Sequence, residues 1–522
     1  MPVDQPPVQP FLPVTPVPAI HLLAQPDHGG IPVAVVSHGY HYLVTGNTLL
    51  SSQHIRKLLN RAANPKDAVG ALSTAYRQEG YFLVAVKAAV NGQSIHMMVV
   101  QGQITDKQVA FGLEWFYTGL RGEHLDESDI IQRNILASAY STRNGHQLAV
   151  SFAPAPNPGG STLNVEQKPL PGYQMVGGSL MFGNYGSRYT SSYIGGASVY
   201  IRPGAGLEID GSYSHGIPSL SKASTGSVYY QGSIGINSIT PWGTYGFTTQ
   251  WTHYMLGQVT APYYFTGNVE TDMLTGSQLL YANTNTRFAV NEGYAWSHYR
   301  ETVLQGLYTL SKQDYQYYTV GATYNRIVHP FGENGSATLG FNYNQGVSGY
   351  HGTFVKGPGA PSPQFRYLTF NTGYTQSLPW GMSAQFTGNG QWAFNTLPQN
   401  QEWVVGGFGS VSAYDAGILV GDSGYSARLS LQTPAVHHFG VMATGSLFYE
   451  TAGVTSYYLS PHQAPWQNLS DVGIGLNLST QWGTTISVMS ALPVSHSVYP
   501  ASSAANLSKE RMDAYFILQQ RF

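Results

Sequence analysis

From residue 171 to its end, the sequence alternates between apolar and polar residues with a period of two. Between Met382 and Phe394, the even positions hold Met, Ala, Phe, Gly, Gly, Trp and Phe, and most odd positions hold Ser, Gln, Thr or Asn. The same alternation runs from Asp471 to Trp482. A period of two predicts strands with one apolar and one polar face. Because no helical segment is available to cover such a long sheet, the pattern favours a transmembrane barrel that closes on itself.

The composition agrees with a wall that faces both lipid and water. Charged residues make up 10% of the chain, whereas an ordinary soluble protein has roughly 25%. Apolar residues reach only 42%, so a large core does not explain the shortage of charge; Gly (60) and Tyr (37) fill the difference. The net charge of -2 gives no basic surface for nucleic acid. The absence of cysteine excludes a disulfide scaffold, a thiolate metal site and a Cys nucleophile.

Short and long connections alternate along this part of the chain, as in outer-membrane barrels. The short turns are rich in Pro, Trp and Gly and the long loops are polar; the turns lie at 203–206, 241–244, 379–382 and 481–484, and the loops at 347–363, 396–422, 452–469 and 493–510. Three turns contain Trp-Gly, which predicts an interfacial aromatic girdle. The spacing predicts about sixteen antiparallel strands. The terminal Phe522 is expected to act as the signal read by the barrel-assembly machinery.

The first part of the chain has a different pattern. Residues 1–35 form a Pro-rich leader that we expect to be extended and flexible. Residues 36–106 predict a β-α-α-β-β module, with helices near Ser52 and Val69, and 107–170 predict a second copy with a helix start near Ser128. The barrel is expected over 171–522. The N-terminus has neither a basic n-region nor an apolar h-region, so no signal peptide is visible. No apolar run is long enough for a transmembrane helix.

Three short motifs suggest other chemistry. Residues 421–424 read Gly-Asp-Ser-Gly, as around a trypsin-like nucleophile, but without a matching triad we interpret them as the start of a strand. His437 and His438 have no nearby carboxylates, so a solvated turn is favoured over a metal site. The clustered tyrosines fit barrel wall or girdle better than a sugar-binding surface. We therefore predict no catalytic, metal or cofactor-binding residues and no enzyme activity.

Two small modules before a barrel of this size resemble the two-partner secretion transporters, the haemolysin secretion/activation proteins (ShlB/FhaC/HecB type, TpsB) of the Omp85 superfamily. The first module resembles a family POTRA domain in residues 42–50, 76–81 and 100–104, and 153–163 resemble the Pro-Gly-rich approach to the last strand of the second. Residues 183–186 match the end of the family's first barrel strand. The most specific similarity runs from 403–407 to 421–424 and implies a gating loop at 396–422 that folds back into the pore.

The gating loop departs from the family at its tip. The resemblance implies Val-Arg-Gly-Tyr/Phe, but the chain has Val411-Ser412-Ala413-Tyr414. In the family, the Arg pairs with an acidic residue of the inner wall, whose counterpart here is Glu450. Without the Arg, we expect neutral hydrogen bonds or the surrogate Arg428 to anchor the tip. The remaining loop residues that the resemblance implies are Gly406, Gly407, Asp422 and Gly424. The leader also lacks an obvious plug helix.

The resemblance implies a translocator that captures an unfolded exoprotein (TpsA-like) in the periplasm and passes it through its barrel to the cell surface. Its expected place is the outer membrane, as a monomer in contact with lipid, with the POTRA modules in the periplasm. Two alternatives remain. A barrel-assembly factor usually carries more POTRA modules, and a passive porin would not need them.

Overall fold

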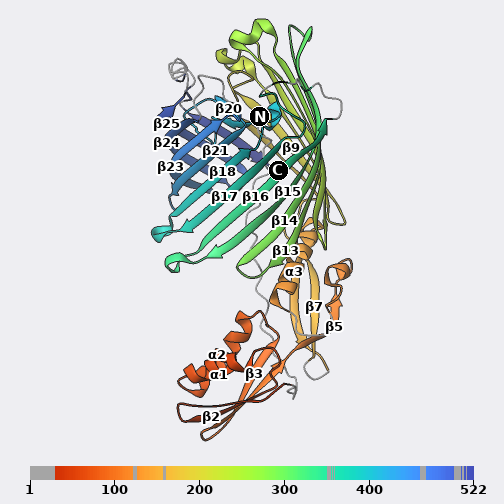
Figure 1. Ribbon diagram of the computed structural model, residues 1–522, viewed down its shortest axis with the longest axis vertical. Helices are drawn as coiled ribbons and strands as arrows, with labels where there is room; N and C mark the ends of the chain where they lie inside the picture. The colour runs from red at the N-terminus through yellow and green to blue at the C-terminus, as the bar shows by residue number, and fades with distance from the viewer. Residues whose placement is uncertain are drawn as a thin grey trace.

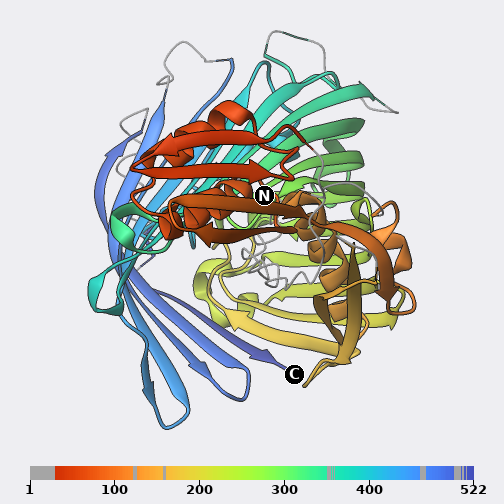
Figure 2. The ribbon, with the colours of Figure 1, turned by 90° about the horizontal axis from the view of Figure 1, so that it is seen from below.

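The computed structural model describes residues 30–120, 126–156, 160–349, 354, 357, 359–458, 466–498, 507, 511–512 and 514–522. Two small α+β modules lie in line below a large barrel (Figure 1). Seen from below, the first module lies across the opening of the barrel (Figure 2). The predicted order of two modules followed by a barrel is therefore the order of the structure.

The first module is a four-stranded sheet with two helices. Its strands have the order β1-β2-β4-β3, and β2 and β4 are parallel. Ser51 and Asn64 cap the two helices, and their side chains accept the N–H groups of His54 and Asp67. The elements are β1 (Val33–Ser37), β2 (Tyr40–Thr45), α1 (Ser52–Arg61), α2 (Pro65–Gln78), β3 (Val84–Asn91) and β4 (Ser94–Gln101). The hairpin partner β1 is an addition to the predicted β-α-α-β-β order.

The second module differs more from the prediction. Its elements are β5 (Gln103–Val109), η1 (Glu114–Tyr117), α3 (Glu127–Arg143), β6 (His146–Pro154) and β7 (Gly160–Pro169), with the sheet order β5-β7-β6. Among the described residues, the module has one α-helix, α3, and before it lies a 3-10 turn, so the two helices of a second β-α-α-β-β copy are not both present. Gly112 and Gly119 take positive φ angles of 84° and 81° on either side of this turn, and such angles end a regular helix. Strand β5 also crosses the boundary expected between residues 106 and 107.

The barrel is closed, with sixteen strand positions around its ring, because β22 continues the position of β21 beside β23. The predicted class, a transmembrane β-barrel of about sixteen antiparallel strands preceded by two α+β POTRA modules, is confirmed. The strands are β8 (Val176–Gly183), β9 (Ile194–Gly204), β10 (Leu207–Gly216), β11 (Val228–Thr240), β12 (Gly243–Met255), β13 (Thr266–Ala282), β14 (Thr286–Val303), β15 (Tyr308–Val328), β16 (Gly335–Gly349), β17 (Arg366–Ser377), β18 (Ser383–Ala393), β21 (Ser423–Gln432), β22 (Val436–His438), β23 (Val441–Thr455), β24 (Gln467–Thr480), β25 (Thr484–Ser497) and β26 (Tyr515–Arg521).

Shorter elements lie between these strands. A hairpin of β19 (Trp403–Val405) and β20 (Leu419–Gly421) stands outside the ring of strands. Six 3-10 turns occupy other connections: η2 (Pro218–Leu220), η3 (Lys222–Ser224), η4 (Gln258–Tyr263), η5 (Pro330–Gly332), η6 (Pro379–Gly381) and η7 (Gln399–Gln401). In the part of the chain that the structure describes, no helix is both long and apolar enough to cross a bilayer.

The register separates an outer from an inner face of the wall. Leu429 pairs with Tyr449, and Tyr449 with Val472, and all three side chains are exposed on the outside. One position along, Glu450 pairs with Asp471, and both are buried on the inside. Apolar residues outside and polar residues inside are the arrangement of a barrel in lipid.

The Trp residues of the short turns are strongly exposed, as an interfacial girdle requires. The exposed fractions are 69% for Trp242, 88% for Trp380 and 67% for Trp482. The histidine pair lies in β22 rather than in a turn, and both side chains are exposed. The Gly-Asp-Ser-Gly motif ends β20 and begins β21, so its interpretation as a strand start is confirmed.

Candidate functional site: the loop inside the barrel

The loop between β18 and β21 turns back against the inside of the wall. Its tip, Val411 to Tyr414, is almost completely buried. Gly406 and Gly407 take φ angles of 104° and 89°, which favour glycine. A Cβ on Gly406 would lie 2.3 Å from the carbonyl oxygen of Asp415. The two glycines therefore permit the narrow hairpin that carries the tip inward.

Two backbone N–H groups of the tip bind two carboxylates of the wall. The N–H of Ser412 donates to Glu450 Oε2 at 2.8 Å, and the N–H of Ala413 donates to Asp471 Oδ2 at 2.7 Å. Both carboxylate side chains are completely buried (0% exposed). Hydrogen bonds to ionised acceptors are about twice as strong as neutral ones. The tip is thus held by main-chain donors in place of a side-chain cation.

Arg428 stabilises the same carboxylates from the wall. Its Nη1 lies 2.9 Å from Glu450 Oε1, and its Cζ lies 3.9 Å from the centre of the Phe448 ring. Register places Arg428 on β21 opposite Glu450 on β23, which in turn is opposite Asp471 on β24. The guanidinium therefore pairs with the buried Glu450, and the N–H donors of the tip bind both Glu450 and Asp471, which supplies the hydrogen bonds that buried acids need.

Apolar packing and the last barrel strand hold the tip as well. The N–H of Met512 donates to the carbonyl oxygen of Ala413 at 3.1 Å, and the Tyr515 hydroxyl donates to the main-chain carbonyl oxygen of Tyr414 at 2.9 Å. Val411 and Tyr414 belong to one buried cluster with side chains of β23, β24 and β25. The tip is therefore tied to the last strands of the barrel, next to the seam where β26 pairs with β8.

The base of the loop is fixed at Asp422. This carboxylate accepts the N–H of Leu397 through Oδ1 at 2.6 Å and the N–H of Tyr457 through Oδ2 at 2.8 Å. Burial is the main cause that raises the pKa of the Glu402 carboxyl group to about 7, and the nearby negative charge of Asp422 is the second. A Cβ on Gly424 would lie 2.1 Å from Trp403 Cδ1, so the glycine lets the hairpin pack on β21.

Three partners of the tip were missed in the sequence: Asp471, Met512 and Tyr515. Asp471 lies on the polar face of an alternating strand, where an aspartate is expected. Its role shows only once the pairing of β23 with β24 places it opposite Glu450. Met512 precedes the last strand, and its contact with the tip uses main-chain atoms that carry no sequence signal. Only Glu450 and Arg428 had been predicted as anchors.

The terminal residue lies at the closing seam. Main-chain hydrogen bonds join Phe522 and Gly178 in both directions, at 3.0 and 3.1 Å, and extend the pairing of β26 with β8. The Phe522 side chain is 60% exposed. The end of the chain is therefore part of the closure of the barrel.

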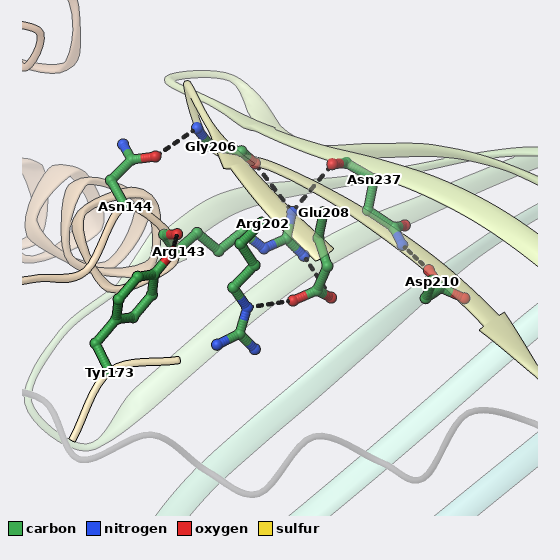
Figure 3. Close-up of polar contacts among 8 residues, drawn as sticks. All are labelled: Arg143, Asn144, Tyr173, Arg202, Gly206, Glu208, Asp210 and Asn237. Atoms are coloured by element: carbon green, nitrogen blue, oxygen red, sulfur yellow. Dashed lines mark hydrogen bonds and ion pairs between the residues drawn. The ribbon is translucent and has the colours of Figure 1, made fainter. Parts of the chain in front are cut away.

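A second polar site joins the modules to the inside of the barrel (Figure 3). Arg143, at the end of α3, donates through Nη1 to the carbonyl oxygens of Gly206 and Asn237, at 3.1 and 3.2 Å. Its Nη2 lies 3.7 Å from Glu208 Oε1, and Arg202 Nε donates to Glu208 Oε2 at 2.7 Å. Burial lowers the pKa of the Arg143 guanidinium, which the Glu208 carboxylate opposes.

Other contacts surround this arginine. Asn144 Oδ1 accepts the N–H of Gly206 at 3.0 Å, and the Tyr173 hydroxyl donates to the carbonyl oxygen of Arg143 at 2.8 Å. Further along α3, Glu127 Oε1 accepts the hydroxyl of Thr284 at 2.9 Å. The second module therefore contacts the turns β9–β10 and β13–β14 through one helix.

Arg143→Ala is expected to weaken this contact by about 2–4 kcal/mol, because two hydrogen bonds from a charged, partly buried donor are lost. Limited proteolysis of the folded full chain measures the effect as faster cleavage between module and barrel. Arg77→Ala, at the exposed end of α2, is the matched control. Equal cleavage of the two variants would show that Arg143 does not hold the module.

Comparison with known proteins agrees with this architecture. Residues 159–449, more than half of the chain, match the family described as "Haemolysin secretion/activation protein ShlB/FhaC/HecB". CdiB from Escherichia coli has the same fold, with a TM-score of 0.73 at 17% identity over 98% of this chain and 94% of that chain. CdiB from Acinetobacter baumannii gives 0.67 at 14% identity, with the same coverage of 98% and 94%.

The similarity to curated relatives is more local. The heme/hemopexin transporter protein HuxB of Haemophilus influenzae is 29% identical over 147 residues, which are 26% of this chain and 25% of that protein. The chain thus matches about a quarter of the length of this relative.

A closed barrel of sixteen positions, preceded by two α+β modules and holding an inward hairpin, defines the class of outer-membrane β-barrel proteins. Within this class, the chain belongs to the haemolysin secretion/activation (ShlB/FhaC/HecB) family, and the resemblance stated from its sequence is confirmed.

Proposed function

We propose that the chain is the outer-membrane translocator of a two-partner secretion system. It captures an unfolded exoprotein in the periplasm and passes it through the barrel to the cell surface. The observation that carries this proposal is the hairpin tip bound to Glu450 and Asp471 inside the wall. A loop held inside the barrel by hydrogen bonds and side-chain packing alone can be displaced by an incoming chain, whereas a passive pore has no need of it.

The two modules supply the capture surface. In the first sheet, β1 and β3 are edge strands, and the residues from Lys87 to Asn91 of β3 are exposed. An unfolded chain can add to such an edge by main-chain hydrogen bonds, which demand no fixed side-chain sequence. The contacts of Arg143 place the second module at the mouth of the lumen. Residues 36–170 therefore act as the receptor and 396–422 as the gate.

The remaining assignments follow from this role. The modules lie in the periplasm and the opposite end of the barrel lies outside the cell. The protein works as a monomer in lipid, and Phe522 is the signal for the barrel-assembly machinery. Passage is driven by binding and by folding of the exoprotein outside, since no nucleotide-binding motif is present in the sequence. The protein transports a polypeptide and neither catalyses a reaction nor uses a cofactor.

Purification of the full chain from the envelope is expected to recover one long secreted polypeptide, identified by mass spectrometry. A strain that lacks residues 33–169 should lose secretion of this polypeptide, while heat-modifiable migration shows that its barrel still folds. Loss of many barrel proteins on depletion would instead indicate an assembly factor. Unchanged conductance and unchanged secretion in the deletion strain would indicate a passive porin.

A further inference from the structure

The outer wall of β11–β15 carries a polar hollow at the end away from the modules, where these strands rise beyond the rest of the barrel (Figure 1). Its volume is about 430 Å³, and its lining includes Tyr230, Trp251, Glu270, Arg300, Lys312 and Asp314. We call it the outer hollow. Register places all six side chains on the face opposite to Tyr299 and Gln313, so the hollow is separate from the lumen.

Two cations stand side by side in this hollow. Arg300 on β14 lies directly opposite Lys312 on β15. Like charges in this position destabilise a sheet unless an anion compensates them. Asp314 Oδ2 lies 3.4 Å from Lys312 Nζ, and Asp314 Oδ1 lies 3.1 Å from His298 Nδ1. Arg300 is exposed, and no hydrogen bond or ion pair joins it to another residue in the described ranges. Its guanidinium fork is therefore available to a phosphate.

Aromatic and acidic groups complete the lining. The ring of Tyr230 stacks on that of His253, with centres 4.7 Å apart. Trp251 also lines the hollow, and Glu270 is exposed beside it. Aromatic rings offer a flat, amphipathic surface to a ligand, and carboxylates accept hydrogen bonds from its hydroxyl groups. The hollow thus combines a site for an anion with a site for a polyhydroxylated ligand.

The position of the hollow along the barrel axis indicates at which level of the membrane such a ligand resides. Tyr294 and Trp296 lie on the same outer face of β14, with ring centres 4.9 Å apart, as in an interfacial aromatic belt. Arg300 follows Trp296 by about 13 Å along the strand, or about 10 Å along the barrel axis at the usual tilt. This is the level of lipid headgroups in the outer leaflet, given the orientation in the proposed function.

We propose that the outer hollow binds the headgroup of a phosphorylated glycolipid of the outer leaflet. Arg300 and Lys312 bind its phosphate, and Tyr230, Trp251 and Glu270 contact the sugar. Neither the lumen nor the loop takes part, so the site anchors and orients the barrel in the membrane rather than moving cargo.

Native mass spectrometry of the full chain in detergent, with diphosphoryl lipid A as the probe, tests this proposal. Wild type is expected to retain the lipid, and Arg300→Ala with Lys312→Ala to bind it about tenfold more weakly, since two charged contacts are lost at a solvent-exposed site, where each contributes little. Arg326→Ala is the matched control, because Arg326 is exposed on the same face of β15 at its other end. Heat-modifiable migration confirms that each barrel is folded.

Equal retention by wild type and the double variant would overturn the proposal. Equal binding of phosphatidylglycerol would overturn the choice of a glycolipid, and release of lipid A by millimolar inorganic phosphate would point to a simple anion site. Secretion is measured separately: a chain that secretes normally but binds no lipid A refutes only this inference, whereas one that binds lipid A but secretes nothing refutes only the proposed function.

Discussion

A chain with both Glu450→Ala and Asp471→Ala is expected to hold its barrel open. The two carboxyl groups accept the N–H groups of Ser412 and Ala413, and their loss leaves two buried donors without acceptors. Each bond lost in this way costs about 1–3 kcal/mol. Their joint loss corresponds to a change of roughly 10²–10⁴ in the ratio of closed to open states. Single-channel recording in planar bilayers measures this change as the fraction of time spent at high conductance.

Two further variants make this result specific. Glu450→Gln with Asp471→Asn keeps oxygen acceptors without charge, so its open fraction should lie between those of wild type and the double alanine variant. Asp272→Ala removes a carboxylate from the outer face of β13 and should leave conductance unchanged. If all three variants gate like wild type, the carboxylates do not hold the loop.

The barrel could be predicted because every one of its strands must meet the same requirement. Every strand must place apolar groups in lipid and polar groups in the lumen, so each strand carries its own evidence, as Leu429 and Arg428 show on adjacent positions. The second module carried no such repetition. Within it, the sequence indicated a start only for the helix near Ser128, and positive φ angles at Gly112 and Gly119 confine the preceding segment to a 3-10 turn among the described residues.

The loop inside the barrel was predictable only in part for a related reason. The sequence showed that the expected arginine is missing from the tip, and it offered Glu450 and Arg428 as anchors, which the structure places 2.9 Å apart. It could not show that Asp471 joins them, because register across β23 and β24 depends on the closed barrel. Nor could it show that main-chain N–H groups replace the arginine, since every residue but proline has one.

The two polar sites together suggest how capture and gating are coupled. Arg143 connects the second module to Glu208, which lies on β10 at the mouth of the lumen. The loop tip, in turn, contacts the seam through Tyr515 of β26. Between them lie only β8 and β9, which join β26 to β10 in the ring. Under the proposed function, a cargo chain that shifts the module would displace strands adjacent to those that contact the tip.

Cross-linking the tip is expected to abolish secretion reversibly. The bridge between Tyr414 and Arg511, with the bond from Met512 N–H to the Ala413 carbonyl, sets Ala413 opposite Met512 in an antiparallel register. Directly opposed Cα atoms lie about 4.5–5.5 Å apart, within the range of a disulfide. Because the chain contains no cysteine, Ala413→Cys with Met512→Cys introduces the sole pair of thiols.

Oxidised protein with this pair should export no exoprotein, and a reductant should restore export, because the backbone N–H groups that bind the carboxylates are unchanged. The measurement is the amount of exoprotein in the medium before and after reduction, with each single cysteine variant as a control. Loss of export that a reductant does not reverse would indicate damage to packing. Full export by the oxidised pair would show that the tip stays in place during transport, and 396–422 would then not be the gate.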